Sequence, residues 1–469
     1  MGRRTKIVAT IGPASHTEAV MERLVRAGMD VARINLSHGT LAEHTRVIKA
    51  LRRVSDRLGK PVAVMVDLPG PKLRLGRLAE PLTLAAGQRV TLGPKAELPV
   101  NFPELVEHFA PGEQVLVDDG AVGLRVVAVA PGRGGATATL EVENPGVVSS
   151  HKGVNLPDTV LPIPAMTAQD RRFVEFAVEH DVDYVALSFV RHAEDVRDLK
   201  EAIGAAGGDQ LTIAKIEKKE ALAEVADIIA AADAVMVARG DLGVEIPPAE
   251  VPIWQKRIIH AAIVAGRPVI TATQMLQSMV ESPRPTRAEA SDVANAIYDS
   301  SCAVMLSGET AVGQYPVEAV ATMAEIATTV EADIERVGRA AQPWGLDRSG
   351  VSEAISFGAC DVAFKVGAAA IVTATASGAT ARAVAKNRPP HPIVAVSHRP
   401  RTVRQLALVW GVTPLLGEPV SGLSHLSDQV NDLMLQCELA APGDIVVLTA
   451  GLRANEPGAT NLIKAYALV

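Results

Sequence analysis

The sequence predicts an α/β protein: a (β/α)₈ barrel with a small β-barrel lid domain inserted in it and an α/β domain at its C-terminal end. Apolar runs rich in β-branched residues alternate with helical stretches, three times before residue 70 and five times after residue 166. This alternation is typical of βα units around a parallel sheet. Eight such units fit a closed barrel better than an open doubly wound sheet.

Each apolar run has the length of a strand and is bounded by polar or turn residues. The eight expected barrel strands cover residues 5–9, 31–36, 61–67, 183–189, 211–217, 234–238, 268–273 and 303–307. Helices are expected at 17–27 and 41–58, and alanine-rich helices after each of the last five strands.

The alternation of strand and helix stops between residues 70 and 156, where one short helical piece near Phe102 is expected. Short Val, Leu and Thr runs separated by Gly, Pro and Asp-Asp-Gly predict an inserted β domain with strands at 88–92, 114–117, 124–129 and 136–142. A Gly/Pro linker at 340–349 precedes further apolar runs at 370–375, 392–396, 412–416 and 444–449. The expected domains are therefore 1–69 and 157–340 for the barrel, 70–156 for the lid and 341–469 for the C-terminal domain.

Length and composition restrict the class of protein. A chain of 469 residues is too long to fold around a single hydrophobic core, so several domains are expected. Its content of 48% hydrophobic and 21% charged residues indicates a folded globular protein. A net charge of −7 and 3% aromatic residues argue against a nucleic-acid partner. No apolar run is long enough for a membrane span and no signal core is seen, so a cytoplasmic protein is expected. Cys302, Cys360 and Cys437 lie far apart in apolar segments and indicate core residues.

Polar side chains gather where the expected strands end, which is where a barrel enzyme carries its active site. They are Arg33, Asn35, Ser37 and His38 after the second strand, Asp67, Ser188, Lys215 with Glu217, Arg239 to Asp241, Thr273 with Gln274, and Ser307 with Glu309. Singly, each has a structural explanation: Asp67 or Ser307 as helix caps, Arg239 as a surface charge, Lys215 and Glu217 as a strand ion pair. Together they would leave unpaired charges in a closed barrel mouth.

A shared anionic ligand, bound through a metal ion, would pair these otherwise unpaired charges. Glu217 and Asp241 are the kind of carboxylate pair that holds Mg²⁺ or Mn²⁺. Arg33 and Lys215 supply positive charge for a phosphate or a carboxylate, and Gly240 allows a ligand to approach the backbone. The pattern indicates a small phosphorylated carboxylate as the ligand.

Seven segments, in order and spacing, resemble the pyruvate kinase family across essentially the whole chain. They are RINLSHG at 33–39, DLPGPKLR at 67–74, HKGVNLP at 151–157, IAKIE at 213–217, MVARGDLGVEIP at 236–247, ATQML at 272–276 and MLSGET at 305–310. The resemblance implies transfer of the phosphoryl group of phosphoenolpyruvate to ADP, giving pyruvate and ATP in the final step of glycolysis.

The resemblance also implies a role for each residue of the barrel mouth. Lys215 would stabilise the transferring phosphoryl group and the enolate, and Arg33 would neutralise the substrate phosphate. Glu217 and Asp241 would hold the divalent cation. Thr273 would hydrogen-bond the substrate carboxylate or help to protonate the enolate, and the amides of Gly240 and Asp241 would receive that carboxylate.

Contacts to the nucleotide are implied for Asn35, His38, Arg74 and Lys152. Lys152 belongs to the inserted domain, which would close on the nucleotide and exclude water from the phosphoryl donor.

The chain departs from the common family pattern at Lys72, where an acidic residue is expected. In the family a potassium ion is held by groups that correspond to Asn35, Ser37, Asp67 and the carbonyl of Leu68. A lysine ammonium carries the same unit charge, so we expect that potassium is not required here. A solvent-facing loop lysine is the alternative.

A second departure concerns the C-terminal phosphate loop at 373–380, which contains no Arg or Lys. Thr375, Ser377 and Thr380 would contact an effector there, so a sugar monophosphate or AMP is expected in preference to a bisphosphate. A plain helix cap is the alternative. The family resemblance also implies a homotetramer.

Two other functions fit part of the pattern. A phosphoenolpyruvate-using lyase or synthase could employ the same Lys, Glu, Asp and Mg²⁺, but would need no nucleotide lid. A catalytically silent sugar-phosphate sensor would not need Lys215, Glu217, Asp241 and Thr273.

Overall fold

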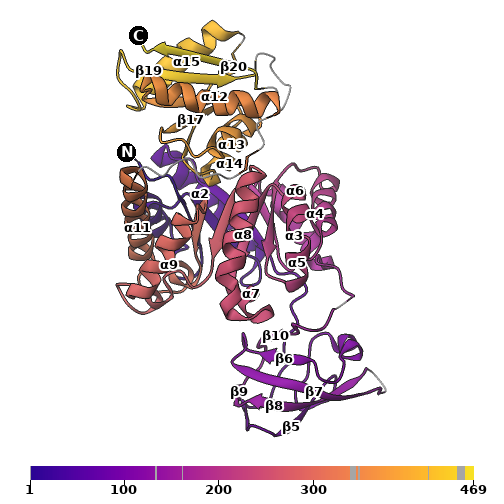
Figure 1. Ribbon diagram of the computed structural model, residues 1–469. Helices are drawn as coiled ribbons and strands as arrows, with labels where there is room; N and C mark the ends of the chain where they lie inside the picture. The colour runs from indigo at the N-terminus through magenta and orange to yellow at the C-terminus, as the bar shows by residue number, and fades with distance from the viewer. Residues whose placement is uncertain are drawn as a thin grey trace.

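The computed structural model describes residues 2–132, 135–160, 162–337, 345–346, 349–420, 422–451 and 460–469. Figure 1 shows three parts in a row, with the barrel between the inserted β domain at one end and the C-terminal domain at the other. The expected linker at 340–349 lies largely outside the described residues.

Eight parallel strands form the closed barrel, which confirms the predicted fold class. Around the barrel the order is β1, β15, β14, β13, β12, β11, β3 and β2. The strands are β1 (Lys6–Thr10), β2 (Val31–Asn35), β3 (Ala63–Leu68), β11 (Tyr184–Leu187), β12 (Leu211–Ile216), β13 (Ala234–Ala238), β14 (Val269–Ala272) and β15 (Ala303–Leu306).

Helices surround the barrel (Figure 1). They are α1 (Glu18–Ala27), α2 (Leu41–Leu58), α3 (Ala168–Glu179), α4 (Ala193–Ala205), α5 (Lys219–Ala223), α6 (Val225–Ala231), α7 (Arg239–Glu245), α8 (Val251–Val264), α9 (Arg287–Tyr298), α10 (Gly308–Ala311) and α11 (Pro316–Val337), with 3₁₀ turns η2 (Pro248–Glu250) and η3 (Gln277–Val280). Helix α2 shows why a predicted boundary can be sharp. Thr40 and Glu43 form a capping box at its start, and Gly59 ends it in the left-handed region at φ 60°.

The inserted domain consists of strands and one short 3₁₀ helix, η1 (Pro103–His108). An antiparallel sheet has the order β10 (Val154–Asn155), β6 (Gln114–Val117), β7 (Val122–Ala130), β8 (Thr137–Asn144) and β5 (Arg89–Leu92). A second sheet pairs β4 (Leu82–Leu84) with β9 (Gly146–Val148). Within the described residues of this domain the named strands form these two sheets, and isolated bridges also join Leu75 with Val100 and Leu92 with Leu98. β4, β9 and β10 were not predicted, because two or three residues carry too little pattern.

The C-terminal domain is a sheet of order β18 (Val412–Leu416), β17 (Ile393–Ser397), β16 (Ala370–Ala374), β19 (Ile445–Ala450) and β20 (Leu462–Ala467). Its helices are α12 (Val351–Val366), α13 (Ala379–Ala385), α14 (Pro400–Gln405) and α15 (Leu423–Gln436), with the turn η4 (Leu406–Leu408). The four predicted strands are parallel, whereas β20 is an antiparallel edge strand that was not predicted.

The interior of the barrel is packed with side chains. Val8, Met65, Ile213 and Met305 belong to one buried cluster with Ala407 and Leu408 of η4. Because Lys6 and Tyr184, at the starts of β1 and β11, donate to carbonyls of the C-terminal domain, that domain covers the amino ends of the barrel strands. The carboxyl ends face the inserted domain. In the described part of the chain, no helix is both long and apolar enough to cross a membrane.

Candidate active site

Lys215 lies at the centre of the polar residues at the carboxyl end of the barrel. Its ammonium donates to Ser188 Oγ at 2.7 Å and lies 3.4 Å from both Asp67 Oδ1 and Glu217 Oε2. Burial by itself lowers the pKa of Lys215, but the charges of Asp67, Glu217 and Asp241 outweigh it and raise the pKa above its usual value. The site therefore holds a fixed positive charge in a dry environment.

Asp67 connects this lysine with Arg33. Its Oδ2 accepts from Arg33 Nε at 2.8 Å and lies 2.7 Å from Arg33 Nη2, while Arg33 Nη1 donates to Thr10 Oγ1 at 3.0 Å. Burial opposes ionisation of Asp67, yet Lys215 and Arg33 hold its pKa below the usual value. Asp67 is thus an ionised, paired carboxylate, and it is neither a helix cap nor an isolated charge.

Glu217 is 1% exposed and accepts a 2.6 Å hydrogen bond from the backbone N–H of Phe189. Burial raises its pKa to about 7; Lys215 opposes this rise, and the nearby negative charge of Asp241 adds to it. The buried Glu217 and Asp241, whose side chain is 32% exposed, repel each other and offer hard oxygen ligands to a divalent cation. They fit Mg²⁺ or Mn²⁺ by their chemistry.

Asp241 lies in the first turn of α7, and Lys72 from the start of the inserted domain is its ion-pair partner at 3.6 Å. Among the residues that the structure describes, no three His, Cys, Asp or Glu side chains converge on a metal position. A cation held by Glu217 and Asp241 would therefore complete its coordination with substrate oxygens and water, as Mg²⁺ commonly does.

Thr273 and Gly240 meet at the same rim. The N–H of Gly240 donates to Thr273 Oγ1 at 2.7 Å, and Thr273 has an unusual φ of 71° for a β-branched residue. Arg239 stabilises this conformation, since it donates to the carbonyl of Thr273 at 2.8 Å and pairs with Asp292 at 2.7 Å. The alternative explanation of Arg239 as a surface charge does not hold, because its side chain is 12% exposed.

The nucleotide residues fall into two groups, and in the described part of the chain no hydrogen bond or ion pair joins one group to the other. Asn35 is the last residue of β2 and His38 is in the loop that follows, and Asn35 Oδ1 accepts from the N–H of Ser37 at 3.1 Å. An open cleft of about 580 Å³ adjoins this loop, between Ser37, His44 and the helix α3. Arg74 and Lys152 lie in the inserted domain, where Arg74 donates to the carbonyl of His151 and Lys152 pairs with Asp118 at 2.9 Å.

Ser188 and Phe189 have a larger part in the site than the sequence indicates. Ser188 Oγ accepts from Lys215 and donates to the carbonyl of Leu68 at 2.8 Å, and Phe189 reaches Glu217 through its N–H. The available signal was the position of Ser188 at a strand end. The positive φ of Phe189, 58°, could not be predicted from the sequence, because phenylalanine does not favour this conformation.

The predicted effector loop lies at the start of α13. Thr375 Oγ1 accepts from the N–H of Gly378 at 2.9 Å, and the hydroxyls of Thr380 and Thr460 are 2.8 Å apart. Although the loop contains no basic residue, Arg382 lies beside it and donates to the carbonyl of Ser377 at 3.2 Å.

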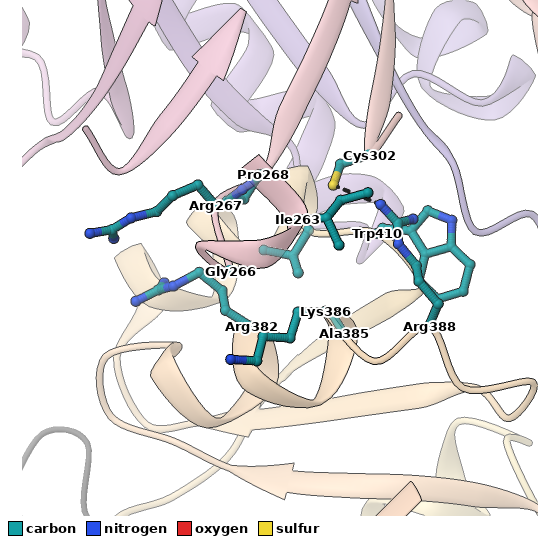
Figure 2. Close-up of a pocket in the computed structure, with 11 residues that line it drawn as sticks. Ile263, Gly266, Arg267, Pro268, Cys302, Arg382, Ala385, Lys386, Arg388 and Trp410 are labelled. Carbon is teal, nitrogen blue, oxygen red and sulfur yellow. Dashed lines mark hydrogen bonds between the residues drawn. The ribbon is translucent and has the colours of Figure 1, made fainter. Parts of the chain in front are cut away.

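A separate cavity lies between the barrel and the C-terminal domain. Figure 2 shows Arg267, Arg382, Lys386 and Arg388 around it, together with Trp410, and Arg388 donates to the sulfur of Cys302 at 3.1 Å. Its volume of about 20 Å³ holds roughly one water molecule. The cavity is therefore part of the domain contact and has no room for an effector.

Comparison with known proteins agrees with this geometry. The family model described as the pyruvate kinase barrel domain matches residues 2–320, and the one described as the pyruvate kinase alpha/beta domain matches residues 353–466. A pyruvate kinase of Clostridium acetobutylicum is 41% identical over 98% of this chain and 99% of its own length. One from Geobacillus stearothermophilus is 44% identical over 100% of this chain and 81% of its own length.

A third relative, pyruvate kinase 2 of Synechocystis, is 43% identical over 98% of this chain and 79% of its own length. The names of these relatives favour the kinase over the lyase or synthase alternative. With both family domains matched and the barrel mouth assembled from the expected residues, the chain belongs to the pyruvate kinase family, whose enzymes transfer a phosphoryl group from phosphoenolpyruvate to ADP in glycolysis.

Proposed function

We propose that Lys215 is the central catalytic residue of this phosphoryl transfer, and that Arg33 and Thr273 act on either side of it. The observation that carries the proposal is the buried, charged Lys215 ammonium between Asp67 and Glu217. Phosphoryl transfer needs positioning and neutralisation of charge more than covalent catalysis. A preorganised ammonium in a dry site supplies both to the transferring group and to the enolate.

Glu217 and Asp241 would hold Mg²⁺ or Mn²⁺, which supplies Lewis-acid polarisation of the substrate oxygens when bound. The amides of Gly240 and Asp241, in the first turn of α7, would receive the substrate carboxylate. In this structure the Gly240 N–H donates to Thr273 Oγ1, so it would exchange this partner for the substrate carboxylate, and the Thr273 hydroxyl would then lie beside that carboxylate. Glu217→Gln and Asp241→Asn should each raise the Mg²⁺ concentration needed for half activity.

Asn35 and His38 would contact the nucleotide from the barrel, and Arg74 and Lys152 from the inserted domain. This division supports a lid that closes on the nucleotide and excludes water from the phosphoryl donor. The ammonium of Lys72 would replace the potassium ion that the family generally uses beside Asn35, Ser37, Asp67 and the Leu68 carbonyl.

A sugar monophosphate or AMP would bind to Thr375, Ser377 and Thr380, with Arg382 as the nearby cation. The enzyme would act in the cytoplasm, and it would be a homotetramer. A substrate saturation curve that no such compound moves would leave the loop a helix cap. Size-exclusion chromatography with light scattering tests the tetramer.

The central test is Lys215→Met, which keeps most of the packing volume and removes the ammonium. We expect kcat to fall at least about a hundredfold with a smaller change in KM, as for a group that acts in the transition state. Lys219→Met is the matched control, because Lys219 is an exposed lysine four residues away. A near-normal kcat in Lys215→Met would overturn the assignment.

A further inference from the structure

The turn after β11 contacts the predicted catalytic lysine, one predicted metal ligand and the start of the inserted domain. Ser188 is 3% exposed, and its hydroxyl bridges Lys215 on β12 and the Leu68 carbonyl on β3. Phe189 donates its backbone N–H to Glu217. The ring of Phe189 lies against Gly70, where a Cβ on that glycine would be 2.6 Å from a ring carbon.

The Ser188 hydroxyl has one proton, and its shorter donor contact is the Leu68 carbonyl at 2.8 Å, against 3.4 Å for Asp67 Oδ1. With the proton directed at Leu68, a lone pair of Oγ is left to accept from Lys215. The orientation of the hydroxyl, and therefore the direction of one N–H of Lys215, is set by the backbone of the neighbouring strand.

The distances around Lys215 show what this contact achieves. The neutral Ser188 oxygen is 2.7 Å from the ammonium, whereas the carboxylates of Asp67 and Glu217 are both at 3.4 Å. A charge-assisted hydrogen bond to a carboxylate is normally 2.7 to 2.9 Å, about half an ångström shorter than these contacts. Ser188 thus holds the ammonium between two carboxylates without a tight pair to either.

We propose that Ser188 is a positioning residue for Lys215, which keeps the ammonium away from Glu217 so that Lys215 is available to the phosphoryl group and Glu217 to the metal ion. The proposal rests on the proposed roles of Lys215 and Glu217. Without the hydroxyl, the ammonium moves onto a carboxylate and forms a close ion pair. Such a pair neutralises the charge that the transition state needs and covers an oxygen that the cation needs.

The left-handed conformation of Phe189 contributes to the same separation of Lys215 and Glu217. A φ of 58° is uncommon for a residue with a side chain, and this residue delivers its N–H to Glu217 Oε1 while its ring packs on Gly70. Glu217 is therefore held from the Phe189 side and approached by Lys215 from the Ser188 side.

The test is Ser188→Ala, measured by steady-state kinetics and by Mn²⁺ binding without substrate, using electron paramagnetic resonance. We expect kcat to fall about tenfold or more with little change in the KM for phosphoenolpyruvate, and the Mn²⁺ dissociation constant to rise several-fold. Ser188→Thr keeps the hydroxyl and should recover both. The metal measurement matters because a merely structural loss would not weaken Mn²⁺ binding in the folded protein.

Ser301→Ala is the matched control. Ser301 is 1% exposed and its hydroxyl lies 2.7 Å from that of Thr271, just before β15 at the opposite end of the barrel. It should lose a similar amount of thermal stability while kcat and Mn²⁺ affinity stay normal. If Ser188→Ala behaves like this control, the proposal is wrong.

A double variant separates this inference from the proposed function. In a Lys215→Met background, Ser188→Ala should cause no further fall in kcat, because the group that it positions is gone. Full activity of the single variant Lys215→Met would show that Lys215 does not have the proposed catalytic role. An impaired Lys215→Met together with a normal Ser188→Ala would refute only the positioning role. If Ser188→Ala does not fold, Ser188→Thr still tests the proposal, because it keeps the hydroxyl. A fall in both kcat and Mn²⁺ affinity in Ser188→Thr would contradict the proposal.

Discussion

At the scale of single residues, the protonation of Glu217 links pH to metal binding. Because burial raises its pKa to about 7, a growing fraction of the carboxyl is protonated as pH falls below 7. A proton and a divalent cation compete for the same oxygens. The dissociation constant for Mn²⁺, measured without substrate, should therefore rise between pH 8 and pH 6. In Asp241→Asn the midpoint of this change should shift to lower pH, since one of the charges that raise the Glu217 pKa is removed. A dissociation constant that is independent of pH would place the cation away from Glu217.

Lys72 carries the second prediction at this scale. Its ammonium pairs with Asp241 at 3.6 Å and its side chain passes Gly153, where a Cβ would be 3.1 Å from Lys72 Cε. We expect full activity in sodium- and potassium-free buffer that contains Mg²⁺ and a tetraalkylammonium salt, because the tethered cation supplies the charge of potassium. Lys72→Glu should acquire a potassium requirement. A wild-type enzyme that is inert until potassium is added would contradict the substitution of lysine for the ion.

At the scale of elements, the connection from β3 to the inserted domain depends on Gly70. Its φ is 64°, and a Cβ there would meet the Phe189 ring at 2.6 Å. Gly70→Ala must move either that ring or the first residues of the inserted domain, so both Glu217 and the lid are disturbed. We expect a fall in kcat of roughly tenfold and a lower Tm. Gly59→Ala is the control, because Gly59 has a similar φ of 60° with open space around it; it should lower Tm and leave kcat unchanged. Equal kcat values in the two variants would show that the ring contact has no effect.

At the scale of the whole molecule, a buried ion-pair network joins the barrel to the C-terminal domain. Asp183, directly before β11, is fully buried and accepts from Arg404 Nε at 2.7 Å and from Arg52 Nη2 at 3.0 Å. Leu408 of η4, which follows Arg404 in the chain, belongs to the buried cluster of the barrel interior. Without Arg404, Asp183 would keep Arg52 and the N–H of Val64 as partners, so the cost should be below the about 3–5 kcal/mol of a buried charge left without any partner.

Arg404→Met should therefore lower Tm by several degrees and separate the unfolding of the C-terminal domain from that of the barrel in calorimetry. In Asp183→Asn the same arginine substitution should cost much less, because the buried charge is already gone. One sharp transition at the wild-type Tm in Arg404→Met would mean that this network does not hold the domains together.

The sequence by itself determined the eight barrel strands, the helix α2 and most residues of the barrel mouth. Buried parallel strands are continuous apolar runs, and the polar residues directly after each run must lie at one rim of a closed barrel. Capping residues such as Thr40 and Gly59 mark helix ends locally. These features depend on neighbours in the chain, so they can be predicted from the chain.

Only the tertiary structure decided which partners these residues choose. Lys215 contacts Ser188, 27 residues away, at a shorter distance than it does Glu217, and Lys72 meets Asp241 across the lid connection. The edge strand β20 depends on pairing with β19, and the conformations of Phe189 and Thr273 depend on contacts with other elements. Partner choice of this kind is set by packing and charge between segments distant in sequence, and no local pattern of residues encodes it.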